Sequence, residues 1–156
     1  MSNAIAAAWQ RLHHLPAGRW LFSRLVCFKA PYFGSVRPLF VELQPGYAAV
    51  AMKKRRAVQN HIGTVHAIAM CNIAELAAGT MTDISIPASH RWIPKGMQVE
   101  YLKKAQTDLV AHARATLPST WPDDAADLPV TVEVLDRNGE PVLRTVITMW
   151  VSRKRG

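Results

Sequence analysis

The stretch from Asn60 to Thr82 constrains the fold more than any other part of the chain, because Glu75 is its only full charge. Its length suits a helix of about twenty residues, or roughly 30 Å. A helix that is apolar on nearly every side must also be buried on nearly every side. The sequence therefore predicts a central helix that other elements enclose.

The remaining segments predict a sheet to enclose it. Alternating apolar residues indicate two strands joined by a turn at Pro45-Gly46, with Leu39, Val41 and Leu43 on one face of the first. Six strands are expected in total, at residues 36–44, 47–55, 97–103, 108–116, 129–135 and 142–152. Residues 83–94 contain prolines and are expected to be irregular. We expect an α+β fold in which a curved antiparallel sheet of about six strands wraps around one long helix.

Two further helices are predicted before the first strand, at residues 3–15 and 19–27. They are interpreted as an N-terminal helical extension over residues 1–30, and residues 31–156 as one globular domain. The exposed edges of such a sheet favour pairing with a second copy.

Composition limits the class of protein. The chain has 156 residues, of which 49% are apolar and 19% charged, as in globular domains. A formal charge of +8 favours an anionic partner such as nucleic acid, anionic lipid or a phosphorylated cofactor, without choosing among them. Cys27 and Cys71 are interpreted as reduced core residues, and the start of the chain does not resemble a secretory signal. A cytoplasmic location is expected. A membrane-spanning helix over residues 62–81 is disfavoured, since it would contain His66, Asn72 and Glu75.

Glu75 is the first candidate site residue, because a buried carboxylate is costly unless it is hydrogen-bonded, paired or used in chemistry. The simpler interpretation is a structural Glu75 satisfied by Asn72, Thr64 or a backbone amide. Three polar residues favour a site instead, since Asn60, His61 and His66 gather at the start of the same predicted helix.

These residues carry a family resemblance. Residues 36–152 resemble the hotdog-fold superfamily, whose members act mostly on acyl thioesters of coenzyme A or acyl carrier protein. Thioesterases of the phenylacetate-pathway type have Asn, five residues, His-Gly-Gly, and an acidic residue nine positions after the His. Asn60, His66 and Glu75 keep that spacing, whereas Ala67 and Ile68 replace the glycines. The Asn-His-x-Gly-Thr-x-His-Ala sequence resembles, more specifically, a hotdog family described in general terms as thioesterases.

The resemblance implies an acyl-CoA or acyl-carrier thioesterase. The free backbone amides of His66 and Ala67, at a helix N-terminus, would then stabilise the oxyanion. Glu75 would activate a water molecule or attack the carbonyl directly. Asn60 would orient the carbonyl or the water.

The substrate would be bound by residues next to this motif. Gly63 and Thr64 are expected to contact it, and Lys53 and Arg55, from the basic run 53–56, to meet the phosphates of coenzyme A. A solvated rim or a nucleic-acid patch are other interpretations of that run. Coenzyme A would be part of the substrate, so no cofactor is expected. No metal, nucleic-acid or membrane partner is expected either.

Helix geometry also limits how His66 and Glu75 can lie in one site. Nine residues correspond to about 900° of rotation, so His66 and Glu75 lie on opposite sides of a regular helix. A homodimer with antiparallel helices would bring Glu75 of one copy beside the partner's His66. The sequence therefore favours a homodimer or a dimer of dimers.

Two other functions use the same residues. His61 and Glu75 are fourteen residues apart, the spacing of hotdog dehydratases that act on 3-hydroxyacyl thioesters. Alternatively, the chain binds acyl thioesters or nucleic acid without catalysis, and Glu75 is structural.

Overall fold

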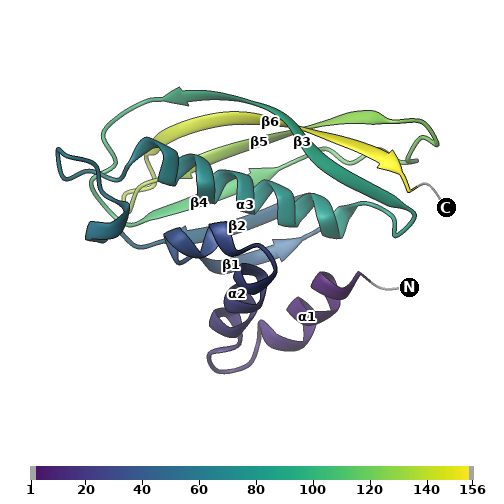
Figure 1. Cartoon of the computed structure of the whole chain (residues 1–156), viewed down its shortest axis with the longest axis horizontal. Coiled ribbons are helices and arrows are strands. Elements are labelled where there is room, and N and C mark those ends of the chain that lie inside the picture. The colour runs from purple at the N-terminus through teal and green to yellow at the C-terminus, as the bar shows by residue number, and fades with distance from the viewer. Residues whose placement is uncertain (1–2, 155–156) are drawn as a thin grey trace.

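The computed structural model describes residues 3–154, and the order of its elements is the predicted one (Figure 1). The elements are α1 (Ala4–Leu12), α2 (Gly18–Lys29), the 3-10 helix η1 (Pro31–Val36), β1 (Leu39–Gln44), β2 (Tyr47–Met52), the 3-10 helix η2 (Arg56–Val58), α3 (Ala67–Ser85), β3 (His90–Tyr101), β4 (Leu109–Arg114), β5 (Ala126–Leu135) and β6 (Pro141–Arg153).

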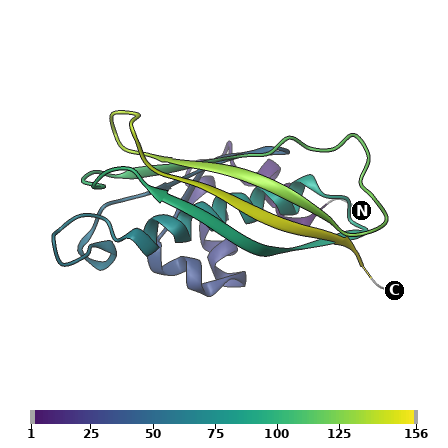
Figure 2. The same ribbon diagram turned by 90° about the horizontal axis from the view of Figure 1, so that it is seen from above.

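The six strands form one curved sheet in the order β1-β2-β4-β5-β6-β3, and every neighbouring pair is antiparallel. Helix α3 connects β2 to β3 and so carries the chain from near one edge of the sheet to the other. Figures 1 and 2 show α3 lying across the sheet, with all the α-helices on the same side. The predicted fold class is confirmed.

The core lies between α3 and the inner face of the sheet. Alternate residues of β4, β5 and β6 point inward, as the period-2 pattern predicts. Fully buried side chains on the two sides include Ile73, Ala77, Met81, Ala111, Val132 and Ile147. Small residues let the backbone of α3 approach its neighbours, and Gly79 is the tightest case. A Cβ atom at Gly79 would lie 2.6 Å from Cη2 of Trp92.

The predicted start of the central helix is wrong by seven residues, because α3 begins at Ala67 and not at Asn60. Residues 60–64 form a turn, and an isolated bridge pairs Gln59 with Val65. His66 has an extended backbone, with φ −64° and ψ 139°, and caps the helix. Asn60 and His61 therefore lie in a loop before α3.

Helix α3 is also not covered on every side. Ile68 is 54% exposed, while Cys71 and Glu75 are half-buried. These three residues follow one another at helical spacing and form one strip along the helix. We refer to Ile68, Cys71 and Glu75 as the open side of α3.

Strand β1 differs from its expected pattern. A β-bulge between Phe40 and Glu42 shifts the register against β2, so Phe40 and Leu43 are both buried while Leu39 is exposed. The expectation that Leu39 and Leu43 share a face with Val41 is therefore wrong.

Helices α1 and α2 contribute to the main core. The ring of Phe22 lies 5.0 Å from that of Trp9 and 5.1 Å from that of Phe40, with edge-to-face geometry in both pairs. The Asn3 side chain caps α1 and donates to Asp83 near the end of α3. Within residues 3–154, no helix is both long and apolar enough to cross a membrane.

Candidate functional site

A tight turn delivers the chain to the start of α3, and Asn60 holds it. Its Oδ1 atom accepts from the amides of Ile62, at 3.2 Å, and Thr64, at 3.1 Å. Its Nδ2 atom donates to Thr64 Oγ1 at 2.8 Å. Gly63 has φ +77°, a conformation that favours glycine. Asn60, Gly63 and Thr64, all predicted site residues, thus shape the loop in front of the helix.

His66 uses both its backbone and its ring at the helix terminus. Its amide donates to the Val58 carbonyl at 2.8 Å, so the expected role of this amide as an oxyanion donor is wrong. Its Nδ1 atom accepts from the Ile68 amide at 3.1 Å. A neutral ring then carries its proton on Nε2, which makes the exposed side of the ring a hydrogen-bond donor.

The amide of Ala67 is free. Among residues 3–154 it has no hydrogen-bond acceptor, although the neighbouring amides of His66 and Ile68 both have one. It lies at the first position of a 19-residue helix, where the helix dipole places positive partial charge. Of the two predicted oxyanion donors, Ala67 is therefore the one that the backbone leaves available.

A small cavity of about 180 Å³ opens beside this terminus. It is lined by Tyr32, Ser35, Val36, Ala57, Val58, Gln59, His66, Ile68, Ala69 and Asn72. Asn72 is 6% exposed, and among the described residues its Oδ1 atom has no hydrogen-bond partner. Its Nδ2 atom makes one long contact, 3.5 Å, to Ser35 Oγ. A buried acceptor without a partner is costly, so Asn72 is an unusual polar residue in the wall of this cavity.

The sequence suggests Asn72 as a hydrogen-bond partner for Glu75. Within residues 3–154 no hydrogen bond joins the two side chains, and only Asn72 lines the cavity. The cavity wall comes partly from η1, which is distant in sequence, so spacing within the motif region could not reveal it.

Arg55 lies next to the cavity. Its guanidinium donates to the carbonyl of Ser35, which is one of the cavity residues. Burial and the neighbouring Arg37 lower the pKa of Arg55 below its usual value. Lys53, predicted together with Arg55, is exposed at the end of β2. The basic run thus begins at the surface and reaches the cavity.

The structure does not bring His61 or Glu75 into the cavity of one chain. His61 is exposed on the turn. Glu75 lies on the open side of α3, and no hydrogen bond or ion pair reaches its carboxylate within residues 3–154. Helix geometry separates Glu75 from His66 by half a turn and by roughly 13 Å along the axis.

The open side of α3 continues onto β3. The Tyr101 hydroxyl lies 3.3 Å from Cys71 Sγ. This hydrogen bond, with a smaller contribution from burial, raises the pKa of Tyr101 to about 12. Within residues 3–154, strand β3 pairs only with β6, so its outer edge is open in this part of the chain. Near that edge Ile93 and Leu102 are 56% and 41% exposed.

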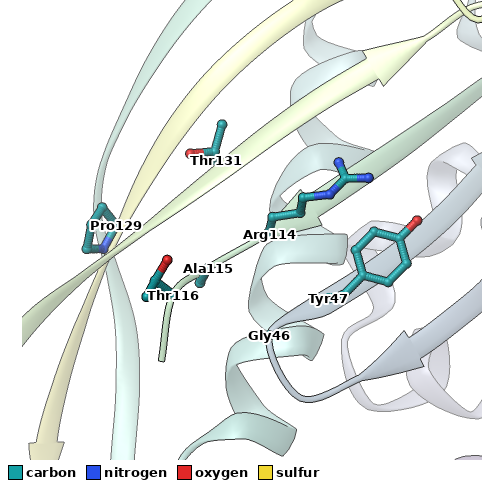
Figure 3. A pocket seen from close by; sticks show the side chains of 7 residues that line it. All are labelled: Gly46, Tyr47, Arg114, Ala115, Thr116, Pro129 and Thr131. Atoms are coloured by element: carbon teal, nitrogen blue, oxygen red, sulfur yellow. The ribbon is translucent and has the colours of Figure 1, made fainter. Parts of the chain in front are cut away.

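A second hollow, of about 720 Å³, lies where the start of β2 and the end of β4 meet β5, within the sheet order and not at its edge strands (Figure 3). The Arg114 guanidinium stands 5.0 Å from the centre of the Tyr47 ring. The Tyr47 hydroxyl lies 2.8 Å from Nδ1 of His112, and burial together with Arg114 lowers the pKa of His112. None of the predicted site residues lines this hollow.

The curved antiparallel sheet around α3, with a free amide at the start of that helix, is the hotdog fold. More specifically, the chain belongs to the family described as "Domain of unknown function (DUF4442)", whose model matches residues 18–151.

Solved structures agree with this assignment. The structural genomics protein APC5556 is 50% identical, with a TM-score of 0.82 over 96% of this chain and 98% of that one. PA5026 from Pseudomonas aeruginosa, described as a probable thioesterase, is 22% identical with a TM-score of 0.76, covering 90% and 97% of the two chains.

Thioesterase HI1161 from Haemophilus influenzae is 8% identical with a TM-score of 0.71, covering 83% of this chain and 87% of that one. At such low identities these last two structures share the fold. No curated protein matches the chain.

Proposed function

We propose that the protein is a thioesterase that hydrolyses acyl groups carried by coenzyme A or acyl carrier protein. One observation carries the proposal: the free amide of Ala67 lies at the positive end of α3, and its chain neighbours His66 and Ile68 line a cavity together with Asn72. Hydrolysis of a thioester develops negative charge on the carbonyl oxygen, and a pre-positioned N–H group stabilises that charge.

The same end of α3 supplies a second donor. The Nε2–H group of His66 would donate to the oxyanion together with the Ala67 amide, because the Nδ1 atom already accepts from the Ile68 amide. Loss of one such donor typically lowers kcat by about 100- to 1,000-fold. The Asn72 Oδ1 atom would accept a hydrogen bond from the attacking water or from an amide of the thiol arm.

The general base in this proposal is Glu75 of a second copy. The carboxylate is half-buried on the open side of α3, and Glu75 is not among the residues that line the cavity of its own chain. Pairing of two β3 edges would place the two open sides face to face, as the unpaired edge and its exposed apolar residues favour. Each homodimer would then hold two equivalent sites, and Arg55 and Lys53 would meet the phosphates of the carrier.

The first experiment measures thiol release from a panel of aliphatic and aromatic acyl-CoA substrates. We expect Glu75→Gln to lower kcat/KM at least about 100-fold. Glu42→Gln, which removes an exposed carboxylate from β1 at the opposite end of the sheet order, is the matched control and should retain activity within about twofold. Thiol release unaffected by Glu75→Gln would remove Glu75 from the mechanism. Hydration of an enoyl thioester without thiol release would instead support a dehydratase that uses His61.

The Ala67 amide is tested by Ala67→Pro. Proline suits the first position of a helix, and the extended backbone of His66 suits the residue before a proline, so the substitution removes only the N–H group. We expect kcat to fall about 100- to 1,000-fold with little change in thermal stability. Full activity in a folded Ala67→Pro protein would contradict the oxyanion role.

Mixing the two variants tests whether the site is shared. In a heterodimer of Ala67→Pro and Glu75→Gln chains, one of the two shared sites is intact. Co-refolded equal mixtures should therefore recover about one quarter of the parent activity by random pairing. A site contained within one chain would recover none.

A further inference from the structure

Helix α2 carries large apolar side chains on two opposite faces, and only one face is covered. Phe22 and Cys27 point into the core. On the other side the exposed fractions are 58% for Trp20, 42% for Leu21, 47% for Leu25 and 87% for Phe28, and Tyr32 in η1 continues the strip at 70%. We call these five residues the α2 strip. An exposed apolar patch of this kind marks an interaction surface.

The charged residues in the sequence around the α2 strip are all cationic. The sequence before Glu42 contains five basic residues, Arg11, Arg19, Arg24, Lys29 and Arg37, and no Asp or Glu. Arg19 and Lys29 are exposed near the two ends of α2. The basic run 53–56 adjoins the same region, since Arg55 donates to Ser35 of η1. Aromatic and leucine side chains flanked by Arg and Lys, without acids, match the surface of an anionic bilayer.

We propose that α2 and η1 dock the protein onto the surface of an anionic lipid bilayer. The side chains of Trp20, Leu25 and Phe28 would enter the boundary between headgroups and acyl chains, while Arg19 and Lys29 would lie at headgroup level. A second copy fits this face poorly, because a two-fold contact would bring identical cationic residues together. The sequence-based expectation of no membrane partner rests on the argument against a membrane-spanning helix. It does not address a surface helix with exposed apolar side chains.

The docked face adjoins the candidate site. Tyr32 ends the α2 strip and also lines the cavity at the start of α3. Docking would therefore place the cavity next to the lipid surface. The docking inference does not rest on thioester hydrolysis, and its test measures binding alone.

The test is co-sedimentation of the full chain with vesicles. We expect binding to phosphatidylcholine vesicles containing about 30% phosphatidylglycerol to be at least about tenfold tighter than to phosphatidylcholine alone. Binding should also weaken by about tenfold or more in 0.5 M salt, because the attraction between cations and headgroups is screened. Parent protein that fails to bind, or that binds both vesicles equally, would overturn the proposal.

Two double variants locate the contact. Leu25→Ser with Phe28→Ser should weaken binding to anionic vesicles at least about tenfold, through loss of apolar contact. Arg19→Gln with Lys29→Gln should weaken it about tenfold or more. Controls come from the outer face of the sheet, where Val146→Ser and Arg144→Gln should leave binding unchanged.

Binding that survives both double variants would overturn the assignment to α2. So would a lower sedimenting mass for Leu25→Ser with Phe28→Ser at unchanged vesicle binding, because the strip would then be a contact between copies.

Discussion

Helices α2 and α3 are both apolar on more than one face, yet the fold treats them differently. Helix α3 lies against the concave face of the sheet, and residues such as Ile73, Ala74 and Ala78 are fully buried. Helix α2 lies beside β1 at one end of the sheet order, so only one of its faces reaches the core. Apolar composition therefore indicates that a helix needs to be buried. The topology determines which of the two helices is buried within one chain.

The largest contrast should appear between the two faces of α2. Phe22 is 1% exposed and contacts the rings of Trp9 and Phe40, so Phe22→Ala should lower the free energy of unfolding by about 3–5 kcal/mol. Leu25→Ala, on the α2 strip, should cost less than about 1 kcal/mol. Urea unfolding of both variants provides the measurement. Equal losses would mean that the strip is covered in solution.

A larger side chain on the covered side of α3 should destabilise the fold. Gly79→Ala would place a Cβ atom against the Trp92 ring and should destabilise by about 1–3 kcal/mol. Gly96→Ala is the control, because a Cβ atom there meets no atom within 4 Å. Adding Trp92→Leu to Gly79→Ala should relieve most of the strain. Thermal unfolding of the three proteins tests this, and a stable Gly79→Ala variant would show that the ring can move away.

Substitution of Asn72 in α3 should lower activity without lowering stability. Asn72→Leu removes a buried acceptor without a partner, so the free energy of unfolding should stay unchanged or rise by up to about 1 kcal/mol. Thiol release should fall at least about tenfold if the amide positions water or substrate. Parallel measurement of urea unfolding and activity tests the prediction. A clear loss of stability would show that Asn72 has a structural partner in solution.

The open side of α3 should give the smallest effect. The pKa of Tyr101 is raised to about 12 from the ordinary tyrosine value of 10.0, so folding favours the protonated hydroxyl. This contribution is complete below pH 10 and is lost as the pH rises from 10 to about 12. Over that range the parent should lose stability relative to Tyr101→Phe, with Tyr32→Phe as the control variant. Parallel stability curves for the parent and Tyr101→Phe would contradict the hydrogen bond to Cys71.

Much of the fold follows from local pattern. The alternation in β4, β5 and β6 and the Asn-Gly turn between the last two strands are short-range signals, and the structure confirms them. Strand β3 begins earlier than the predicted 97–103 because Pro94 lies in an edge strand, where a missing N–H group is tolerated. The bulge in β1 and the turn at Asn60 depend on hydrogen bonds that compete with regular structure.

The candidate site also combines features that have a local sequence signal with features that have none. Motif spacing, through the family resemblance, predicts His66, Ala67 and Glu75 as site residues and places Glu75 half a turn away from His66. The cavity depends on η1 meeting α3, with Ser35 and Asn72 separated by 37 positions. Such a contact leaves no local signal. The proposed role of Glu75 needs a second molecule, which no single chain can supply.

The two edge strands of the sheet differ in whether a helix contacts them. At β1, helix α2 caps the edge, since Ser23 Oγ accepts from the Phe40 amide at 2.9 Å and Arg24 donates to the Pro38 carbonyl at 2.7 Å. At β3 the edge is bare. If two bare edges join, the enlarged sheet ends in a capped edge on both sides. Helix α2 then opposes further strand addition at the start of both outer edges, where it occupies the Phe40 amide.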